Sequence, residues 1–463
     1  MGSSQLSHAE PVAVSAPSNA EEAEIRNRTL QLAGPALVEY TLMSLAGVIN
    51  MIMVGDLGAA AIAAVGLTNQ PVFFIQAGFQ ALSVGATALV ARCIGARDTQ
   101  LAATVARQSL VSTVLLGLLI TAPQVLAARA IVDWMGAEPD VVKPALDYML
   151  VMMSGTVFTV IPLVVSAILR GAGNSRTPMV LNVLTNVLNV VFGYVLIYGY
   201  FGFPRLEVLG AGIGTIGARA VTSVLYVLAL YSKGCVLPLS FKQSHRLDMK
   251  VISRIMHVGI PAALEQFVRR GGQTVFAKTV ASLGTVAYAA HQLTVNAESF
   301  AFNPPTAFQV SATTLVGQYL GADRPDMAER SGYVSLRLSM ITMGLIGTAC
   351  YIFARQIMGI YTDDVSVIEM AVPNMRLFAV ALPGMATSFV MVGSLRGAGD
   401  TRWPLYVSIA SIWVARVGLA YILAIRLGLG LRGAWIAMVG DHCVRAVLSF
   451  LRFRSGGWKR SRV

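Results

Sequence analysis

Long apolar stretches, separated by short gaps that contain Gly, Pro or charged residues, make up most of this 463-residue chain. Most of these stretches reach the roughly 20 apolar residues that an α-helix needs to cross the hydrocarbon core of a bilayer. The pattern therefore predicts an all-α, polytopic membrane protein with twelve transmembrane helices. They are expected near residues 28–53, 61–91, 105–128, 142–168, 178–200, 209–231, 254–280, 286–318, 332–354, 367–393, 404–427 and 432–453.

The composition supports this class of protein and limits the kinds of binding partner that are expected. The chain is 55% hydrophobic and 13% charged, whereas soluble domains carry about 25% charged residues. The net charge of +12 could indicate nucleic-acid binding, but most Lys and Arg lie in the short gaps between apolar stretches. The lipid bilayer is therefore the expected partner, and no nucleic acid is predicted. The four cysteines have neither paired nor metal-ligand spacing, so neither a disulfide framework nor a metal site is predicted.

The gaps alternate in charge along the chain. One set holds most of the Lys and Arg, including Arg92, Arg170, Lys250 and Arg396, and the opposite set is richer in acids. Because Lys and Arg collect on the cytoplasmic side of a membrane protein, both termini are predicted to be cytoplasmic. The chain is thus expected to be a multi-pass protein of the cell's inner (plasma) membrane.

A nine-residue string occurs twice, as RGAGNSRTP from Arg170 and as RGAGDTRWP from Arg396. The separation of these two arginines, 226 positions, also pairs PALVE from Pro35 with PAALE from Pro261. Such matches in one register predict two six-helix lobes related by a parallel repeat, a pattern typical of secondary transporters. The expected division is a disordered cytoplasmic tail at 1–24, lobes at 25–231 and 254–455, a cytoplasmic linker at 232–253 and a basic cytoplasmic tail at 456–463.

Each copy of the repeated string is expected to form the short cytoplasmic turn between the fourth and fifth helices of its lobe. Its glycines permit a tight turn, and Asn174 or Asp400 can accept the backbone hydrogen bonds that open the next helix. The arginines of the string are expected to anchor the turn at the lipid headgroups. No role in substrate binding is predicted for the string.

Together with MVGDLG at 53–58, AAHQ at 289–292 and LVGQYLGA at 315–322, the paired turns resemble the multidrug and toxic compound extrusion (MATE) family, of bacterial type. The resemblance covers about residues 25–455. It implies two lobes that form a V around a central cleft. It also implies cation-coupled antiport that expels organic, often cationic, compounds such as drugs or toxic metabolites. A monomer that is not an enzyme is expected, with no cofactor other than the coupling ion, H⁺ or Na⁺.

Three carboxylates that this resemblance leads one to expect are replaced here. Asn50 stands where the first helix of the family usually carries Asp, and Asn189 is followed four residues later by Gly193 in place of Asp. Arg269 stands where some members carry Glu. The choice between H⁺ and Na⁺ therefore stays open, and Asn50 and Asn189 are kept as candidates for the coupling site.

Glu39 is the leading candidate for ion coupling. A charge at the bilayer centre costs about 2.5–3.5 kcal/mol on translocon scales, so an intramembrane acid has a functional interpretation by default. Pro35, four residues earlier, removes a backbone donor and is expected to kink the helix. A polar notch is predicted there, with Asn69 and Gln70 as cleft candidates beside Asn50 and Asn189. The alternative is a neutral carboxyl that is hydrogen-bonded for packing alone.

Glu265 is the repeat partner of Glu39 and the second candidate for cation coupling. Arg269 lies four residues later on the same helix face, the favourable order for an ion pair. A static Glu265–Arg269 pair is therefore predicted. The alternative is that Arg269 serves as a fixed cation that attracts anionic groups of a substrate.

Further charges fall within the apolar segments of the second lobe. Asp441 and Arg445 are four residues apart, Arg416 precedes them, and Glu298 lies before the FNPP sequence that should break its helix. They are candidates for the cleft, in one network with Glu265 and Arg269, or for structural contacts between helices. If Arg269, Arg270 and Arg416 lined the cleft, the chain could instead be a flippase or exporter of lipid-linked or anionic substrates. An intramembrane enzyme is disfavoured because the sequence lacks its usual motifs.

Overall fold

A computed structural model describes residues 19–232, 234–240 and 246–461, and all regular structure within these ranges is helical. The first half of the chain forms α1 (Asn19–Gly55), α2 (Ala59–Gly95), α3 (Thr99–Trp134), α4 (Pro139–Ser154), α5 (Thr156–Gly171), α6 (Arg176–Tyr198) and α7 (Glu207–Leu230). The second half forms α8 (Met249–Ala281), α9 (Thr285–Ala301), α10 (Asn303–Gly321), α11 (Pro325–Ile352), α12 (Ala354–Gly359), α13 (Val365–Gly397), α14 (Arg402–Ala410) and α15 (Gly430–Arg454). Two π-helical segments, Ser411–Gly418 and Tyr421–Arg426, continue α14.

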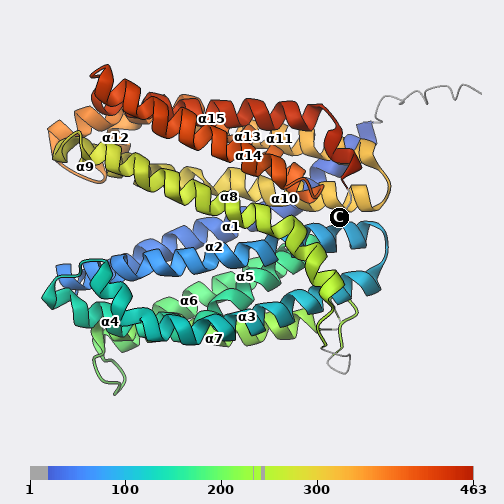
Figure 1. The fold of residues 1–463 in the computed structure, drawn as a ribbon, viewed down its shortest axis with the longest axis horizontal. Coiled ribbons are helices and arrows are strands. Elements are labelled where there is room, and N and C mark those ends of the chain that lie inside the picture. Colours follow the sequence, from blue (N-terminus) through green and yellow to red (C-terminus); the bar gives the residue numbers. More distant parts are fainter. Residues whose placement is uncertain (1–18, 233, 241–245, 462–463) are drawn as a thin grey trace, which may run out of the picture.

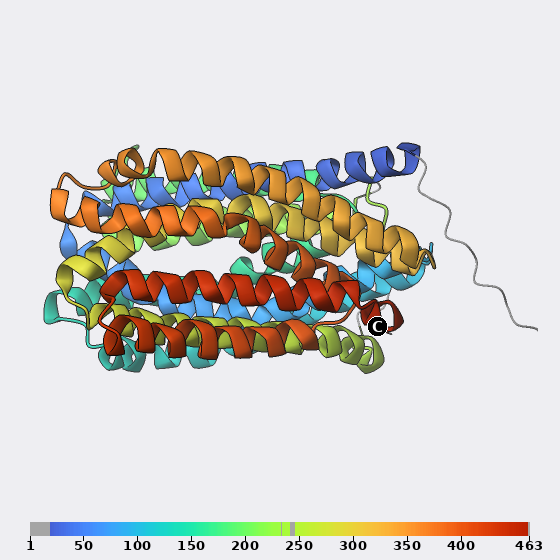
Figure 2. The ribbon, with the colours of Figure 1, turned by 90° about the horizontal axis from the view of Figure 1, so that it is seen from above.

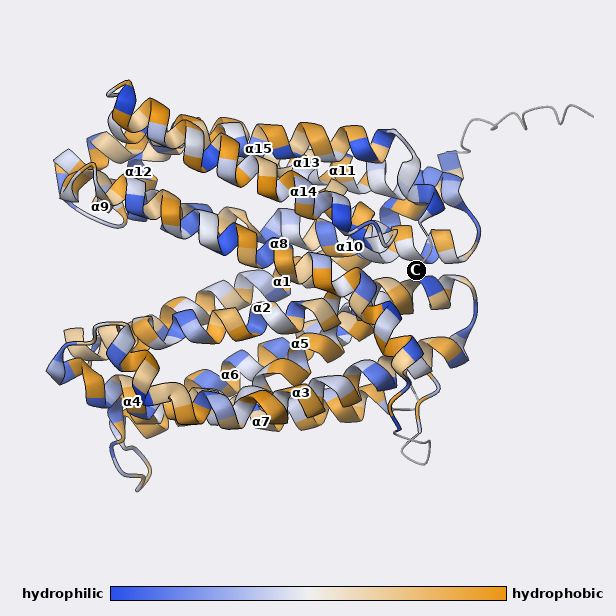
Figure 3. Cartoon of the chain, viewed as in Figure 1, coloured by the Kyte–Doolittle hydropathy of each residue, from blue (hydrophilic) through white to orange (hydrophobic). Residues whose placement is uncertain are grey.

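The prediction of an all-α, multi-pass membrane protein is confirmed. Within the described residues, nine helices are long and apolar enough to cross a membrane, and α4 with α5, bent by 50° at Gly155, forms a tenth if the pair is one span. The predicted crossings at 254–280 and 286–318 fall on α8 and on α9–α10, which are outside this set, so the count of twelve stays a prediction. Hydrophobic residues run along α3, α7 and α15 (Figure 3), and many of them are exposed, as in Leu119, Leu126 and Val447.

The two halves lie side by side as separate groups of helices (Figure 1), which confirms the expected two-lobe fold. Seen from above, the helices of the second half lie in front of most of the first (Figure 2). The two halves lie closest at the end that carries the C-terminus and diverge toward the end with α4 and α9 (Figure 1). The first helix of each half also packs on the other half. Ile255 and Val258 of α8 belong to an apolar core of the first half, and Ala33 and Ala36 of α1 belong to one of the second.

The 226-residue offset read from the sequence holds for contacts as well as for residues. Thr87 Oγ1 donates to the carbonyl of Ala167 at 3.0 Å, and the equivalent Thr313 donates to Gly393 at 2.9 Å. Both contacts tie the last turns of one helix to the helix that precedes the repeated turn. The duplication therefore reproduces the internal packing of a half, not only its sequence.

Contacts between the two halves also pair residues that are equivalent under the 226-residue offset. Gly95 of α2 lies against the backbone carbonyl of Gln318, and Gly321 of α10 lies against that of Arg92. A Cβ atom at either glycine would overlap the facing carbonyl, so only Gly allows α2 and α10 to approach this closely. Because each glycine is the repeat equivalent of the other, the two halves meet here through equivalent surfaces.

Two predicted tails are more ordered than expected. Residues 1–18 of the predicted disordered tail lie outside the described residues, but residues 19–24 form the first turns of α1. There Glu21 pairs with Arg330 at 3.3 Å and Glu22 pairs with Arg337 at 2.7 Å. These ion pairs with α11 stabilise turns that composition alone predicted to be disordered.

The linker and the C-terminal tail also differ from the prediction. α8 begins at Met249, where the Asp248 side chain accepts two backbone hydrogen bonds, so residues 249–253 are helical instead of linker. In the C-terminal tail, Gly457–Arg460 form a 3₁₀ turn. Trp458 is fully buried there, with its ring stacked on Phe453 at a centroid distance of 4.7 Å. Apolar burial thus holds a segment that its basic composition suggested would be free.

Candidate functional site

The repeated turn has the predicted backbone and an unpredicted side-chain arrangement. The Asn174 side chain accepts a hydrogen bond from the Thr177 backbone at 3.0 Å, which confirms its capping role, and Arg176 is exposed. In contrast, Arg170 does not extend to the headgroups. Its largely buried side chain reaches inward to Glu39 of α1, so the expected headgroup anchor is wrong for this residue. Its position at the end of α5 places the guanidinium within reach of an intramembrane acid.

Glu39, Arg170 and Asn182 form the first of two equivalent triads. Glu39 is 1% exposed, and its Oε1 accepts hydrogen bonds from both Arg170 Nη2 and Asn182 Nδ2. Arg170 also donates to the hydroxyl of Tyr40 at 3.1 Å. Within the described part of the chain, Glu39 Oε2 is buried and has no hydrogen-bond partner. The carboxylate is thus paired through one oxygen only.

Glu265, Arg396 and Ser408 form the second triad, each 226 positions after its counterpart. Arg396 Nη2 donates to Glu265 Oε2 at 2.7 Å, and Ser408 Oγ donates to Oε1 at 3.2 Å. The predicted Glu265–Arg269 pair is therefore wrong, because the arginine of the repeated turn takes that place. The guanidinium of Arg269 instead lies 6.0 Å from the centre of the Phe389 ring.

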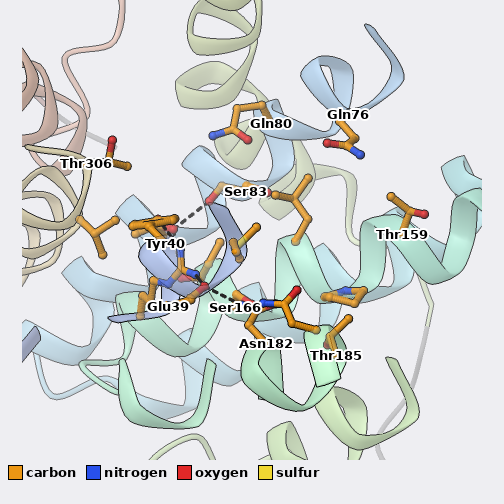
Figure 4. Close-up of a pocket in the computed structure, with 18 of the residues that line it drawn as sticks. Glu39, Tyr40, Gln76, Gln80, Ser83, Thr159, Ser166, Asn182, Thr185 and Thr306 are labelled. Carbon is orange, nitrogen blue, oxygen red and sulfur yellow. Dashed lines mark hydrogen bonds and ion pairs between the residues drawn. The ribbon is translucent and has the colours of Figure 1, made fainter. Parts of the chain in front are cut away.

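A cavity of about 550 Å³ lies beside the first triad. Its walls come from α1, α2, α5, α6 and α7 of the first half and from α10 and α13 of the second. In Figure 4, Glu39, Tyr40 and Asn182 lie across the cavity from Gln76 and Gln80 of α2. The volume is within the roughly 300–1,000 Å³ typical of sites for small molecules. The charged residues in its lining are Glu39, Arg170, Arg219 and Arg396.

The structure separates the polar residues that were predicted around Glu39. Asn50 and Asn189 line the cavity, and Asn189 donates to Thr215 Oγ1 at 3.2 Å. Asn69 and Gln70 lie outside the lining, and Gln70 is exposed. Asn69 lies about 10 Å along α2 from Gln76, toward the end at Gly58, as the helical rise of 1.5 Å per residue requires. The α2 wall is built instead by Gln76 and Gln80.

The other predicted cleft candidates form a buried cluster in the second half. Asp441 pairs with Arg416 and with Arg445, each at 2.9 Å, and Glu298 Oε1 lies 3.9 Å from His442 Nε2. Across the described ranges, no hydrogen bond or ion pair joins this cluster to Glu265 or Arg269. The helix does break before Pro304, as predicted, between α9 and α10. A functional role for Glu298, Arg416 and Asp441 stays a prediction.

Several site residues were missed by sequence reasoning. Arg170 and Arg396 were assigned to the headgroups, and neither Asn182 nor Arg219 was considered. The 226-residue offset could have found three of them, because it pairs Glu39, Arg170 and Asn182 with Glu265, Arg396 and a polar Ser408. A charged or polar residue that recurs at equivalent intramembrane positions is a signal of a shared contact.

Comparison with known proteins identifies related sequences and folds. The family model described as MatE matches twice, at residues 35–195 and 261–422, so its two matches begin at the repeat-equivalent Pro35 and Pro261. The probable multidrug resistance protein NorM of Thermotoga maritima is 34% identical over 96% of this chain and 95% of its own length. The uncharacterized transporter YisQ of Bacillus subtilis is 28% identical over 92% of this chain and 94% of its own.

Solved structures share the fold over nearly the whole chain. An outward-facing multidrug resistance MATE family transporter of the MOP superfamily matches with a TM-score of 0.87 and 26% identity, covering 93% of this chain and 95% of that one. A MOP superfamily transporter from Pyrococcus furiosus, described as having a binding pocket of reverse polarity, matches with a TM-score of 0.88 and 24% identity. It covers 96% of this chain and 100% of that one, and at this identity it shows the fold alone.

Proposed function

Because the chain belongs to the MatE family, as predicted from its sequence motifs, we propose that it is a secondary active multidrug exporter that exchanges small organic compounds for inward-moving H⁺. Relatives that match over almost their full length are named as probable multidrug resistance proteins. The cavity of about 550 Å³ is large enough for a drug-sized molecule and has both polar and apolar walls.

Glu39 is the proposed coupling residue, and its unpartnered Oε2 is the observation that carries the proposal. A buried carboxylate oxygen without a hydrogen-bond donor is costly, and a proton removes that cost by removing the charge. Protonation also weakens the ion pair with Arg170, because the attraction between opposite charges is lost. Proton uptake would therefore loosen the attachment of Arg170 to α1, leaving its hydrogen bond to Tyr40.

H⁺ is favoured over Na⁺ by the chemistry of the same group. The Arg170 guanidinium already occupies Oε1, and a metal cation bound beside it would face a like charge at close range. A proton requires only the free oxygen of Glu39, whereas Na⁺ would require several oxygen ligands around it.

Arg170 also connects the coupling residue to the interface between the halves. Thr314 Oγ1 of α10 donates to the Arg170 backbone carbonyl at 3.0 Å, and Gln318 Nε2 donates to the carbonyl of Gly171 at 3.2 Å. A change at the Glu39–Arg170 pair is thus transmitted to the segment where the second half holds the first. In the proposed cycle this link lets protonation bias the tilt of the two halves during alternating access.

The proposal includes the oligomeric state, the localisation and the kind of substrate. The protein works as a monomer in the inner (plasma) membrane, with the basic end and both termini in the cytoplasm. The flippase alternative depended on Arg269, Arg270 and Arg416 in the cleft, and none of these three arginines lines the cavity. The cavity volume of about 550 Å³ fits a small organic substrate, and the anionic-substrate part of that alternative stays open.

The test is export from proteoliposomes under an imposed pH gradient, an imposed Na⁺ gradient or no gradient, with a panel of cationic, neutral and anionic dyes. We expect export only under the pH gradient, and loss of this export in Glu39→Gln. Export driven equally by Na⁺, or undiminished in Glu39→Gln, would contradict the proposed coupling.

A further inference from the structure

Arg219 differs from Arg170 and Arg396, the other arginines of the cavity lining, because no acidic side chain in the described part of the chain pairs with it. It lies near the middle of the 24-residue helix α7 and is half-buried in the cavity wall. Its Nη1 donates to Thr159 Oγ1 of α5 at 2.9 Å. Among residues 19–232, 234–240 and 246–461, no carboxylate forms an ion pair with it, whereas Arg170 and Arg396 each pair with a glutamate.

The charges of the cavity therefore do not cancel. Glu39 neutralises Arg170, and Arg396 is neutralised by Glu265, so the lining keeps the single positive charge of Arg219. An arginine at this depth is costly unless it pairs with another group or serves a function. The hydroxyl of Thr159 satisfies one of five guanidinium donors and contributes no charge. An anion in the cavity would supply the missing partner.

The neighbouring walls indicate what kind of anion fits. Apolar side chains line one part of the cavity, including Met43, Val84, Pro162 and Leu163. Amide groups line another part, and Asn186 Nδ2 is buried with no hydrogen-bond partner within the described residues. A carboxylate on an apolar body matches both parts, since Arg binds carboxylates in a planar, bidentate geometry.

We propose that Arg219, supported by Thr159, binds the carboxylate of an organic anion, so that amphiphilic carboxylates are a substrate class of the cavity. This inference rests on the proposed function, because it assigns the ligand to the same export cavity. Proton uptake at Glu39 makes the cavity more positive, so charge alone favours anion binding to the protonated form. The exchange of H⁺ for the organic anion must then depend on the conformational change that follows proton uptake. It cannot depend on electrostatic competition between the proton and the anion in the cavity.

The test is equilibrium binding to the purified full-length protein by titration calorimetry, with three naphthalene derivatives of similar size. These are 1-naphthylacetate, its neutral amide and 2-(1-naphthyl)ethylammonium. We expect the anion to bind the wild type about tenfold more tightly than the amide. Arg219→Gln should remove this preference and Arg219→Lys should keep part of it, because Lys retains the charge but not the planar fork.

A control separates charge recognition at Arg219 from a general loss of positive charge. Arg205→Gln removes an exposed arginine outside the cavity lining and should keep the preference for the anion. Equal binding of anion and amide by the wild type would overturn the proposal. So would an unchanged preference in Arg219→Gln or, if that variant does not fold, in Arg219→Lys.

Binding also distinguishes this inference from the proposed function. Export that is indifferent to Glu39→Gln contradicts proton coupling and leaves the anion site intact, provided that the calorimetric preference depends on Arg219. Proton-driven export of the naphthylammonium, together with no anion preference in the wild type, supports the exporter and rejects the anion site.

Discussion

Glu39 and Glu265 occupy equivalent positions in the two halves, and each pairs with the first arginine of its own repeated turn. The hydrogen-bond donors are nevertheless distributed differently over the two oxygens of each carboxylate. In the second half, Arg396 and Ser408 bind separate oxygens of Glu265. In the first half, Arg170 and Asn182 share one oxygen of Glu39, and the other oxygen has no partner among the described residues.

The surroundings of the two triads reinforce this difference. Glu39 lines the cavity, whereas Glu265 lies outside the lining and only its partner Arg396 reaches the wall. Under the proposed function, the Glu265 pair is a structural contact and Glu39 keeps one oxygen available to a proton.

The largest expected effect is on transport. Glu39→Gln should reduce pH-driven export in proteoliposomes to the level of empty liposomes, because the amide cannot carry the proton. Glu265→Gln is the matched variant. The fraction of its molecules that folds should still export substrate in response to the pH gradient. Equal loss of coupling in the two variants, at equal amounts of folded protein, would show that both acids carry protons.

The second effect is on stability, where Glu265→Gln is expected to have a larger effect than Glu39→Gln. Glu265→Gln leaves Arg396 buried without its counter-ion, and breaking such a pair by removing one partner costs about 3–5 kcal/mol. Glu39→Gln should cost less, since Arg170 keeps its hydrogen bond to the hydroxyl of Tyr40. Thermal unfolding of the two detergent-purified variants measures this, and a lower melting temperature for Glu39→Gln than for Glu265→Gln would refute the distinction.

The smallest expected effect comes from exchanging the third members of the triads. The double variant Asn182→Ser with Ser408→Asn keeps both ion pairs and changes one hydrogen bond at each carboxylate, worth about 1.5–3 kcal/mol for a charged acceptor. We expect pH-driven export to persist and still to depend on Glu39. A transfer of that dependence to Glu265 in the exchanged background would mean that Asn182, and not the free oxygen, defines the coupling site.

Much of this architecture follows from the linear sequence. The lengths of the apolar stretches, together with the strings at Arg170 and Arg396, determined a helical membrane protein made of two equivalent halves. Periodic hydrophobicity and a duplicated register are local properties, so they can be recognised without knowing which helices touch. Glu39 could be selected for the same reason, because an isolated acid in an apolar helix is costly wherever that helix packs.

Only the tertiary structure decided which charges meet. The sequence favoured Arg269 for Glu265 because the two are one helical turn apart, but Arg396 approaches from α13 and takes the carboxylate. Arg219 carried a local signal as a charge within an apolar helix, but its lack of an acidic partner in the described residues became visible only when α5 and α7 were placed around the cavity. Ion pairs and cavities arise from contacts between residues far apart in the chain, and these depend on how whole helices pack.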